Sequence, residues 1–94
     1  YHWPVRGAKR LSDDRHWSII FWVWAGAQTR RLRCGVLEQG EQRVVIDVID
    51  PTYPMREIKT PGVTEESVDI VLAAPLGARP MMWRETGERV AIRP

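Results

Sequence analysis

Residues 17–24 read Trp-Ser-Ile-Ile-Phe-Trp-Val-Trp and form the longest and most apolar run in the sequence. Eight residues are too few for a membrane span, which needs about 20, and the β-branched and aromatic content favours a strand. Alternate residues of a strand point to opposite faces. One face then carries Trp17, Ile19, Phe21 and Val23, and the other carries Ser18, Ile20, Trp22 and Trp24. Because both faces are apolar, we expect an inner strand that is covered on both sides.

The tryptophans of this run have two interpretations. In the one we favour, all three are core residues of a doubly covered strand. In the other, Trp22 and Trp24 lie on an exposed face and form a binding platform, because contiguous exposed aromatic residues usually contact something.

Length and composition bound the class of protein. The chain has 94 residues, which is one domain, and a formal net charge of +2, which argues against a dedicated polyanion binder. Cys34 is the single cysteine, so no disulfide forms within the chain, and a reducing compartment such as the cytoplasm is the expected location. We expect no membrane span.

The segment that precedes the apolar run is polar and basic, and it contains Pro4 and Gly7. We interpret residues 1–16 as a basic N-terminal arm or loop, followed by a single β-rich domain over residues 17–94. Ser12 is a candidate cap for one helical turn at the end of the arm.

Two hairpins are predicted after the apolar run, each with a three-residue loop ending in glycine. The first has strands at 29–37 and 43–50 and a loop at 38–40, and the second has its loop at 85–87. Cross-strand charge pairing selects both registers. In the first, Cys34 faces Val44, Leu32 faces Ile46 and Arg31 faces Asp47, and in the second Arg84 faces Glu88, Met82 faces Val90 and Trp83 faces Arg89.

Residues 64–74 fit either a strand or a helix. A strand places Val68, Ile70, Leu72 and Ala74 on one face, whereas a helix would begin at Thr64 as N-cap and end before Pro75. The density of β-branched residues favours the strand. The fold class is therefore mainly β, or α+β if 64–74 is a short helix. We predict an antiparallel meander of five to six strands, forming a barrel or a strongly twisted sheet.

Catalytic and metal-binding patterns are not found. His2, His16 and Cys34 lack the close spacing of zinc ligands, and the serines and glycines lie outside nucleophile-elbow and phosphate-loop contexts. Asp13, Asp14 and His16 cluster along the chain, a pattern that is more often a solvated turn than a catalytic site. We expect no enzymatic activity, no cofactor and no metal.

The function that the sequence favours is a non-enzymatic protein-interaction or assembly module that associates with itself or with another protein. Aromatic and methionine residues are enriched at interfaces, and the candidates here are Trp22, Trp24, Met81, Met82 and Trp83. The short length suggests a phage or another mobile element as the source.

Two alternatives stay open. A single-stranded nucleic-acid binder would use the basic arm and an arginine-rich strand, with Arg6, Lys9, Arg10, Arg31 and Arg33 as candidates. A small-ligand site in the mouth of a β-barrel would place Asp13, Asp14 and His16 at its rim.

Overall fold

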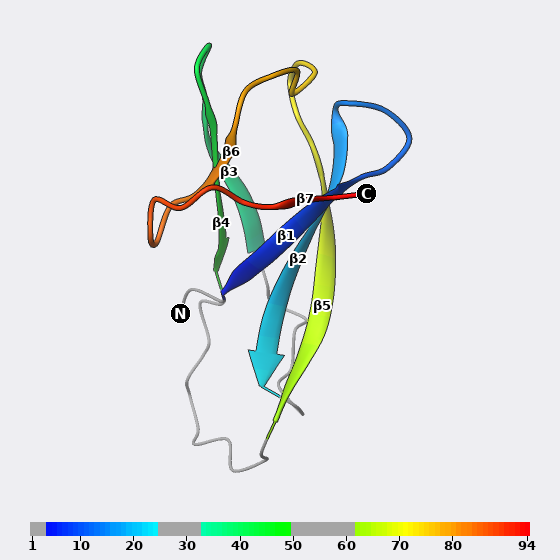
Figure 1. The fold of residues 1–94 in the computed structure, drawn as a ribbon, viewed down its shortest axis with the longest axis vertical. Coiled ribbons are helices and arrows are strands. Elements are labelled where there is room, and N and C mark those ends of the chain that lie inside the picture. The colour runs from blue at the N-terminus through cyan, green and yellow to red at the C-terminus, as the bar shows by residue number, and fades with distance from the viewer. Residues whose placement is uncertain (1–3, 25–32, 50–61) are drawn as a thin grey trace.

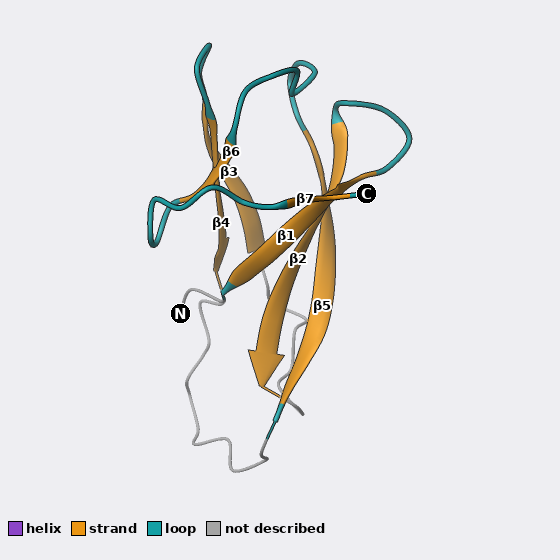
Figure 2. Cartoon of the chain, in the orientation of Figure 1, coloured by secondary structure: helices purple, strands orange, loops and turns teal. Residues whose placement is uncertain are grey.

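The computed structural model describes residues 4–24, 33–49 and 62–94, which form strands joined by turns and loops, without a helix among them (Figure 2). The strands are β1 (Val5–Arg10), β2 (His16–Trp24), β3 (Arg33–Gln39), β4 (Val44–Ile49), β5 (Val63–Val71), β6 (Met81–Trp83) and β7 (Ile92–Arg93). The turn predicted after Trp24, the first residues of the strand predicted at 29–37 and the loop predicted after Asp50 lie outside the described residues.

The strands form a four-stranded sheet of order β5-β2-β1-β7 and a three-stranded sheet of order β3-β4-β6, on opposite sides of Figure 1. Both sheets are mixed, because β1 pairs with β7 and β4 pairs with β6 in parallel. The prediction of a mainly β fold was confirmed, whereas the antiparallel meander order was wrong, and the two sheets of the described residues do not close into a barrel. The local hairpins of the meander exist, but β5 pairs with the distant β2 instead of its sequence neighbour β4. Hydrophobic periodicity does not determine that choice of partner.

The core lies between the two sheets and is built on the apolar run, which is a strand as predicted. Trp17, Ile19, Phe21 and Val23 of β2 are at most 2% exposed. They belong to one buried cluster with Val44, Ile46 and Val48 of β4, in the other sheet. Burial of each such side chain stabilises the fold by about 1.5–3 kcal/mol, so this face of β2 holds the sheets together.

The prediction of an arm or loop over residues 1–16 was wrong for Val5–Arg10. These residues form β1 and pair antiparallel with β2. The small Ala8 is fully buried opposite Ile19, and this brings the backbones of β1 and β2 against the same core. Asp13, not Ser12, caps the connecting turn, because its Oδ1 accepts hydrogen bonds from the backbone N–H groups of Arg15 (2.9 Å) and His16 (3.2 Å).

The hairpin of β3 and β4 forms, but its predicted register was wrong. Val48 lies opposite Cys34, Ile46 opposite Val36, and Gly35 takes the place predicted for Arg31 opposite Asp47. Glu38 and Gln39, predicted in the loop, continue β3 past a bulge, so the loop is Gly40–Arg43. Cross-strand charge pairing did not anticipate this register, in which Arg43 Nε lies 2.6 Å from Glu38 Oε2 across the loop.

The last hairpin is one residue out of its predicted register. Met82 pairs with Arg89 instead of Val90, and the loop has four residues, ending at Gly87 with φ +70°. The register of this hairpin is set by its pairing with β4. The parallel ladder between β4 and β6 continues as a hydrogen bond from the backbone N–H of Arg84 to the carbonyl of Ile46 (3.0 Å).

Residues 63–71 form β5, so the strand prediction for this segment was confirmed and the helix alternative was wrong. β5 runs antiparallel to β2 over its whole length, with Ile70 opposite Trp17 and Val68 opposite Ile19. Ile70 and Leu72 are buried, Val68 is half-buried and Ala74, predicted on the same face, is exposed.

The loop that follows β5 makes polar contacts with the β3–β4 turn and with Asp14. Arg79 donates from Nε to the carbonyl of Leu76 (3.0 Å), from Nη1 to that of Gly40 (2.9 Å) and from Nη2 to that of Pro75 (2.8 Å). The bond to Gly40 links the loop to the β3–β4 turn, and the other two lie within the loop itself. Asp14 fixes the opposite side of the loop, because its carbonyl accepts a hydrogen bond from Leu76 N (3.0 Å).

Candidate functional site

The outward face of the four-stranded sheet is open, which corrects the expectation that β2 is covered on both sides. Trp22 is 37% exposed and Ile20 is half-buried, whereas their neighbours on the inward face are buried. Only one face of this sheet packs on the three-stranded sheet. Trp22 is therefore a surface residue, as in the binding-platform interpretation, and Trp17 is a core residue.

Trp22 lies in a network of charged side chains from three strands. The Arg6 guanidinium lies 4.1 Å from the centre of the Trp22 ring, a cation–π contact. Glu65 is opposite Trp22 in the ladder and accepts a hydrogen bond from Arg93 Nη2 at 2.8 Å. That bond lowers the pKa of Glu65 and raises the pKa of Arg93.

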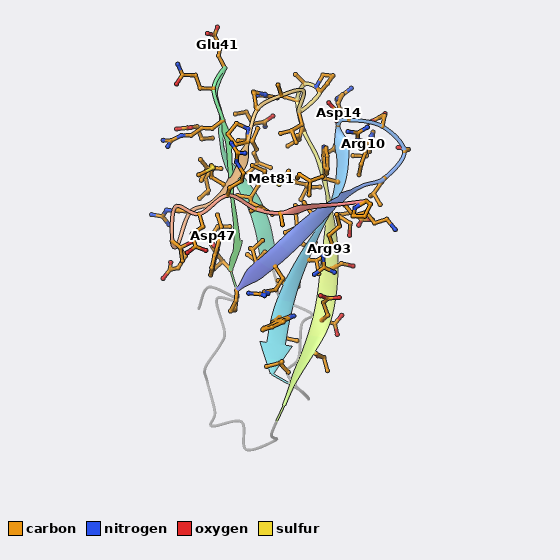
Figure 3. All side chains as sticks on the ribbon, in the orientation of Figure 1. Arg10, Asp14, Glu41, Asp47, Met81 and Arg93 are labelled. Carbon is orange, nitrogen blue, oxygen red and sulfur yellow. The ribbon has the colours of Figure 1, made fainter. Side chains whose placement is uncertain are left out.

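Gly7 gives Arg93 the space for this contact. A Cβ at position 7 would lie 2.8 Å from Arg93 Nε and 3.3 Å from the carbonyl oxygen of Ala91. The side chain of Arg93 therefore crosses directly over the β1 backbone toward β5, and Figure 3 shows it there. Sequence reasoning did not select Gly7, Glu65 or Arg93, since nothing local indicates that β7 lies beside β1.

β5 is an edge strand among the described residues and is the longest edge they contain. Seven of its nine residues are exposed, in the pattern eeeeeieBe. It carries Glu65, Glu66 and Asp69 and no basic residue. Such a strand exposes a row of backbone N–H and C=O groups, and here the row is accompanied by negative charge.

The alternation of an antiparallel ladder shows which backbone N–H groups of β5 point at β2 and which point away from it. Leu72 N donates to the carbonyl of Arg15 at 2.8 Å, just beyond the last ladder pair of β2 and β5. In an antiparallel ladder the N–H groups of successive residues point to opposite sides. Those of Ile70 and Val68 therefore point at β2, and those of Asp69 and Ser67 point away from it.

The five interface candidates do not form one surface. Trp22 lies on the four-stranded sheet, whereas Met81, Met82 and Trp83 form β6 in the other sheet. Met81 is buried in the core, and Met82 and Trp83 are half-buried. The side chain of Trp24 lies outside the described residues. Of these candidates, Trp22 has the clearest exposure.

The nucleic-acid candidates are divided as well. Arg6 contacts the outward-facing Trp22, and Lys9 borders the same outward face beside Ser18 and Ile20. Arg10 contacts the ring of the inward-facing Trp17, 5.6 Å from its centre, and Asp14. Arg31 and the side chain of Arg33 lie outside the described residues. The described members therefore do not line one phosphate track.

The Asp13, Asp14 and His16 cluster has structural contacts. His16 Nδ1 lies 2.7 Å from Asp13 Oδ1, and this hydrogen bond is the main cause of a lowered pKa at Asp13. Asp14 Oδ2 accepts a hydrogen bond from Gly77 N at 2.7 Å. Within residues 4–24, 33–49 and 62–94, no three His, Cys, Asp or Glu side chains gather as metal ligands would.

Comparisons of the chain with protein-family models, with curated proteins and with solved structures gave no match. In the part of the chain that the structure describes, no helix has the length and apolar character needed to cross a membrane.

Proposed function

We propose that this chain is a non-enzymatic protein-binding module that pairs the outer edge of β5 with an extended segment of a partner protein. The observation that carries the proposal is the nine-residue edge strand, exposed at seven positions and bordered by the exposed Trp22. Strand addition to a sheet edge is a common mode of peptide recognition, in which main-chain hydrogen bonds give affinity and side-chain contacts give specificity.

Charge indicates the chemistry of the partner. Glu65, Glu66 and Asp69 make β5 acidic, so a partner strand with lysine or arginine at alternate positions would place opposite charges side by side. Glu65 is already bound by Arg93, which leaves Asp69 as the outward-facing carboxylate best placed for a basic side chain of the partner.

A second copy of the chain is a poor occupant of this edge. Two antiparallel β5 strands would bring the acidic residues of both copies together, and like charges across a ladder are destabilising. Self-association, which the sequence predicts, would therefore use another surface. Light scattering over a wide concentration range tests it, and a monomer throughout would remove that part of the prediction.

The test of strand addition removes one backbone donor from the outer edge. Ser67→Pro deletes an N–H that points away from β2, and proline is tolerated on edge strands at such positions. Ser67→Ala is the matched control, because it keeps the N–H and removes the same hydroxyl. The probe is a synthetic peptide of alternating lysine and valine, titrated into labelled protein and followed by amide chemical shifts.

We expect shifts along β5, binding by the parent protein and by Ser67→Ala, and affinity at least about tenfold lower for Ser67→Pro, since proline breaks the added ladder. Retained β2 amide protection in Ser67→Pro shows that the sheet itself is intact. Equal affinity of the two variants, or shifts confined to other strands, would contradict the proposal. A peptide of alternating glutamate and valine should bind much more weakly.

A further inference from the structure

A concave surface lies outside the Trp22 network, and Trp22, Arg6, Glu65 and Arg93 do not line it. It is a cleft of about 230 Å³ between the β1–β2 turn, the loop before β6 and the segment that leads into β7. Trp17, Leu76, Met81 and Val90 line its apolar interior and are at most 5% exposed, whereas Ile92 is 49% exposed and offers apolar surface at the border. Figure 3 shows Arg10 and Asp14 together beside the β1–β2 turn, with Met81 toward the middle of the molecule.

Three arginines and one carboxylate border this apolar interior, namely Arg10, Arg79, Arg89 and Asp14. Their formal charges, three positive and one negative, give the cleft +2. Arg79 donates to three backbone carbonyls, which hold its guanidinium in place without neutralising its charge. Arg10 Nε lies 3.3 Å from Asp14 Oδ1, and the side chain of Arg10 is 61% exposed, which leaves its other donors accessible.

Asp14 is held by other contacts and does not fill the cleft as a free counter-ion. Its Oδ2 accepts a hydrogen bond from Gly77 N at 2.7 Å, and its carbonyl accepts one from Trp17 Nε1 at 2.8 Å. The carboxylate therefore shapes one wall of the cleft and offsets one of the three positive charges that border it.

We propose that this cleft binds a small organic carboxylate, with its apolar body against the exposed side chain of Ile92 and its carboxylate between Arg10 and Arg89. Arginine suits this task because its planar guanidinium donates two parallel hydrogen bonds to a carboxylate. The volume is below the 300–1,000 Å³ typical of drug-sized ligands, so the ligand has a single ring or a short chain. The site is independent of β5 and of any peptide bound there.

The test uses 3-phenylpropionate as the probe, titrated into the full chain. Trp17 Nε1–H and the amides of Gly77 and Val90 report on the cleft, because these residues line it. We expect saturable shifts at these groups. The neutral alcohol of the same skeleton should bind at least about fivefold more weakly, because it lacks the charge that strengthens hydrogen bonds to arginine. Inorganic phosphate, which lacks the apolar body, should bind more weakly than 3-phenylpropionate.

Three variants distinguish specific binding in the cleft from nonspecific electrostatic attraction to a basic protein. Arg89→Gln should weaken binding at least about fivefold, whereas Lys9→Gln, which removes the same charge from the outward face, should leave it unchanged. Asp14→Asn should tighten binding, because it removes the negative charge while its amide oxygen still accepts from Gly77 N. A purely structural role of Asp14 predicts the opposite sign.

Equal weakening by Arg89→Gln and Lys9→Gln, equal binding of the acid and the alcohol, or shifts that map elsewhere would each overturn the proposal. Preferential binding of phosphate would overturn the assignment of an organic carboxylate. Each variant is first checked by amide spectra, and Arg89 is exposed, so its replacement leaves the core intact.

Discussion

Two neighbouring isoleucines of β2 give the sharpest test of which face of the strand is core. Ile19 is fully buried opposite Ala8 and Val68, whereas the adjacent Ile20 is half-buried on the outward face. The same substitution at both positions, Ile19→Ala and Ile20→Ala, removes the same three carbons from opposite faces of one strand. Strand propensity and sequence position are closely matched, so the two variants differ mainly in burial.

The expected loss in the free energy of unfolding follows from how deeply each side chain is buried. Removing three buried carbons costs about 2.4 kcal/mol at about 0.8 kcal/mol each, and the residual cavity between the two sheets raises the loss at Ile19 to about 3–4 kcal/mol. At Ile20 the side chain borders solvent, no closed cavity forms, and the loss is about 1 kcal/mol. The expected difference in the free energy of unfolding is therefore about 2–3 kcal/mol.

Urea unfolding followed by tryptophan fluorescence measures both losses by linear extrapolation, and similar slopes validate the comparison. A domain of this size has a total stability of about 5–14 kcal/mol, so at the low end Ile19→Ala leaves too little stability for a reliable extrapolation. Ile19→Val and Ile20→Val then replace the alanine variants, with expected losses of about 1 and below about 0.5 kcal/mol. Equal losses at the two positions, or a larger one at Ile20, would refute the assignment of faces.

Three further outcomes are expected. Gly87→Ala should cost about 1–2 kcal/mol, because φ is +70° there, whereas Gly40→Ala should be neutral or stabilising by up to about 0.5 kcal/mol, and thermal unfolding of both variants checks this. Arg79→Lys should cost about 1–2 kcal/mol in urea unfolding, because an ammonium cannot reproduce the three carbonyl contacts of the guanidinium fork, and an unchanged stability would contradict this. The pKa values of Glu38 and Glu65 lie below their usual 4.5 because arginines bind them, so their stabilisation is present above about pH 4.5 and is lost as the pH falls through the folded-state pKa. Replacing Glu38 and Glu65 with glutamine should flatten the stability–pH curve in that acidic range, and an unchanged slope would count against both ion pairs.

The candidate site was only partly accessible to sequence reasoning. Trp22 was selected because exposed aromatic residues are informative, and its exposure supports that choice. Arg6 was selected for its charge alone, whereas its contact with Trp22 depends on β1 lying beside β2. Glu65 and Arg93 were missed, because they are 28 residues apart and meet only through the pairing of β5 and β7 with the central strands.

Local pattern determined several elements of this protein, although not β1, which was predicted as part of an arm. Residues 17–24 are a strand because a short apolar run of aromatic and β-branched residues fits a pleated, buried surface. Residues 63–71 are a strand because β-branched residues are frequent there, although most of the segment is polar and exposed. Both predicted hairpins exist, although both loops have four residues. Charge pairs failed to set the registers because other pairs form in their place, such as Arg43 with Glu38 across the longer loop.

Tertiary structure alone decided how the strands combine. The pairing of β5 with β2, of β7 with β1 and of β6 with β4 joins segments that are far apart in the chain, and the gain comes from closing one shared core between two sheets. Apolar periodicity indicates which face of a strand is buried but not which strand covers it. That is why the sequence supplied the core residues Trp17, Ile19 and Phe21, while the open edge of β5 and the arginine-bordered cleft emerged only from the assembled sheets.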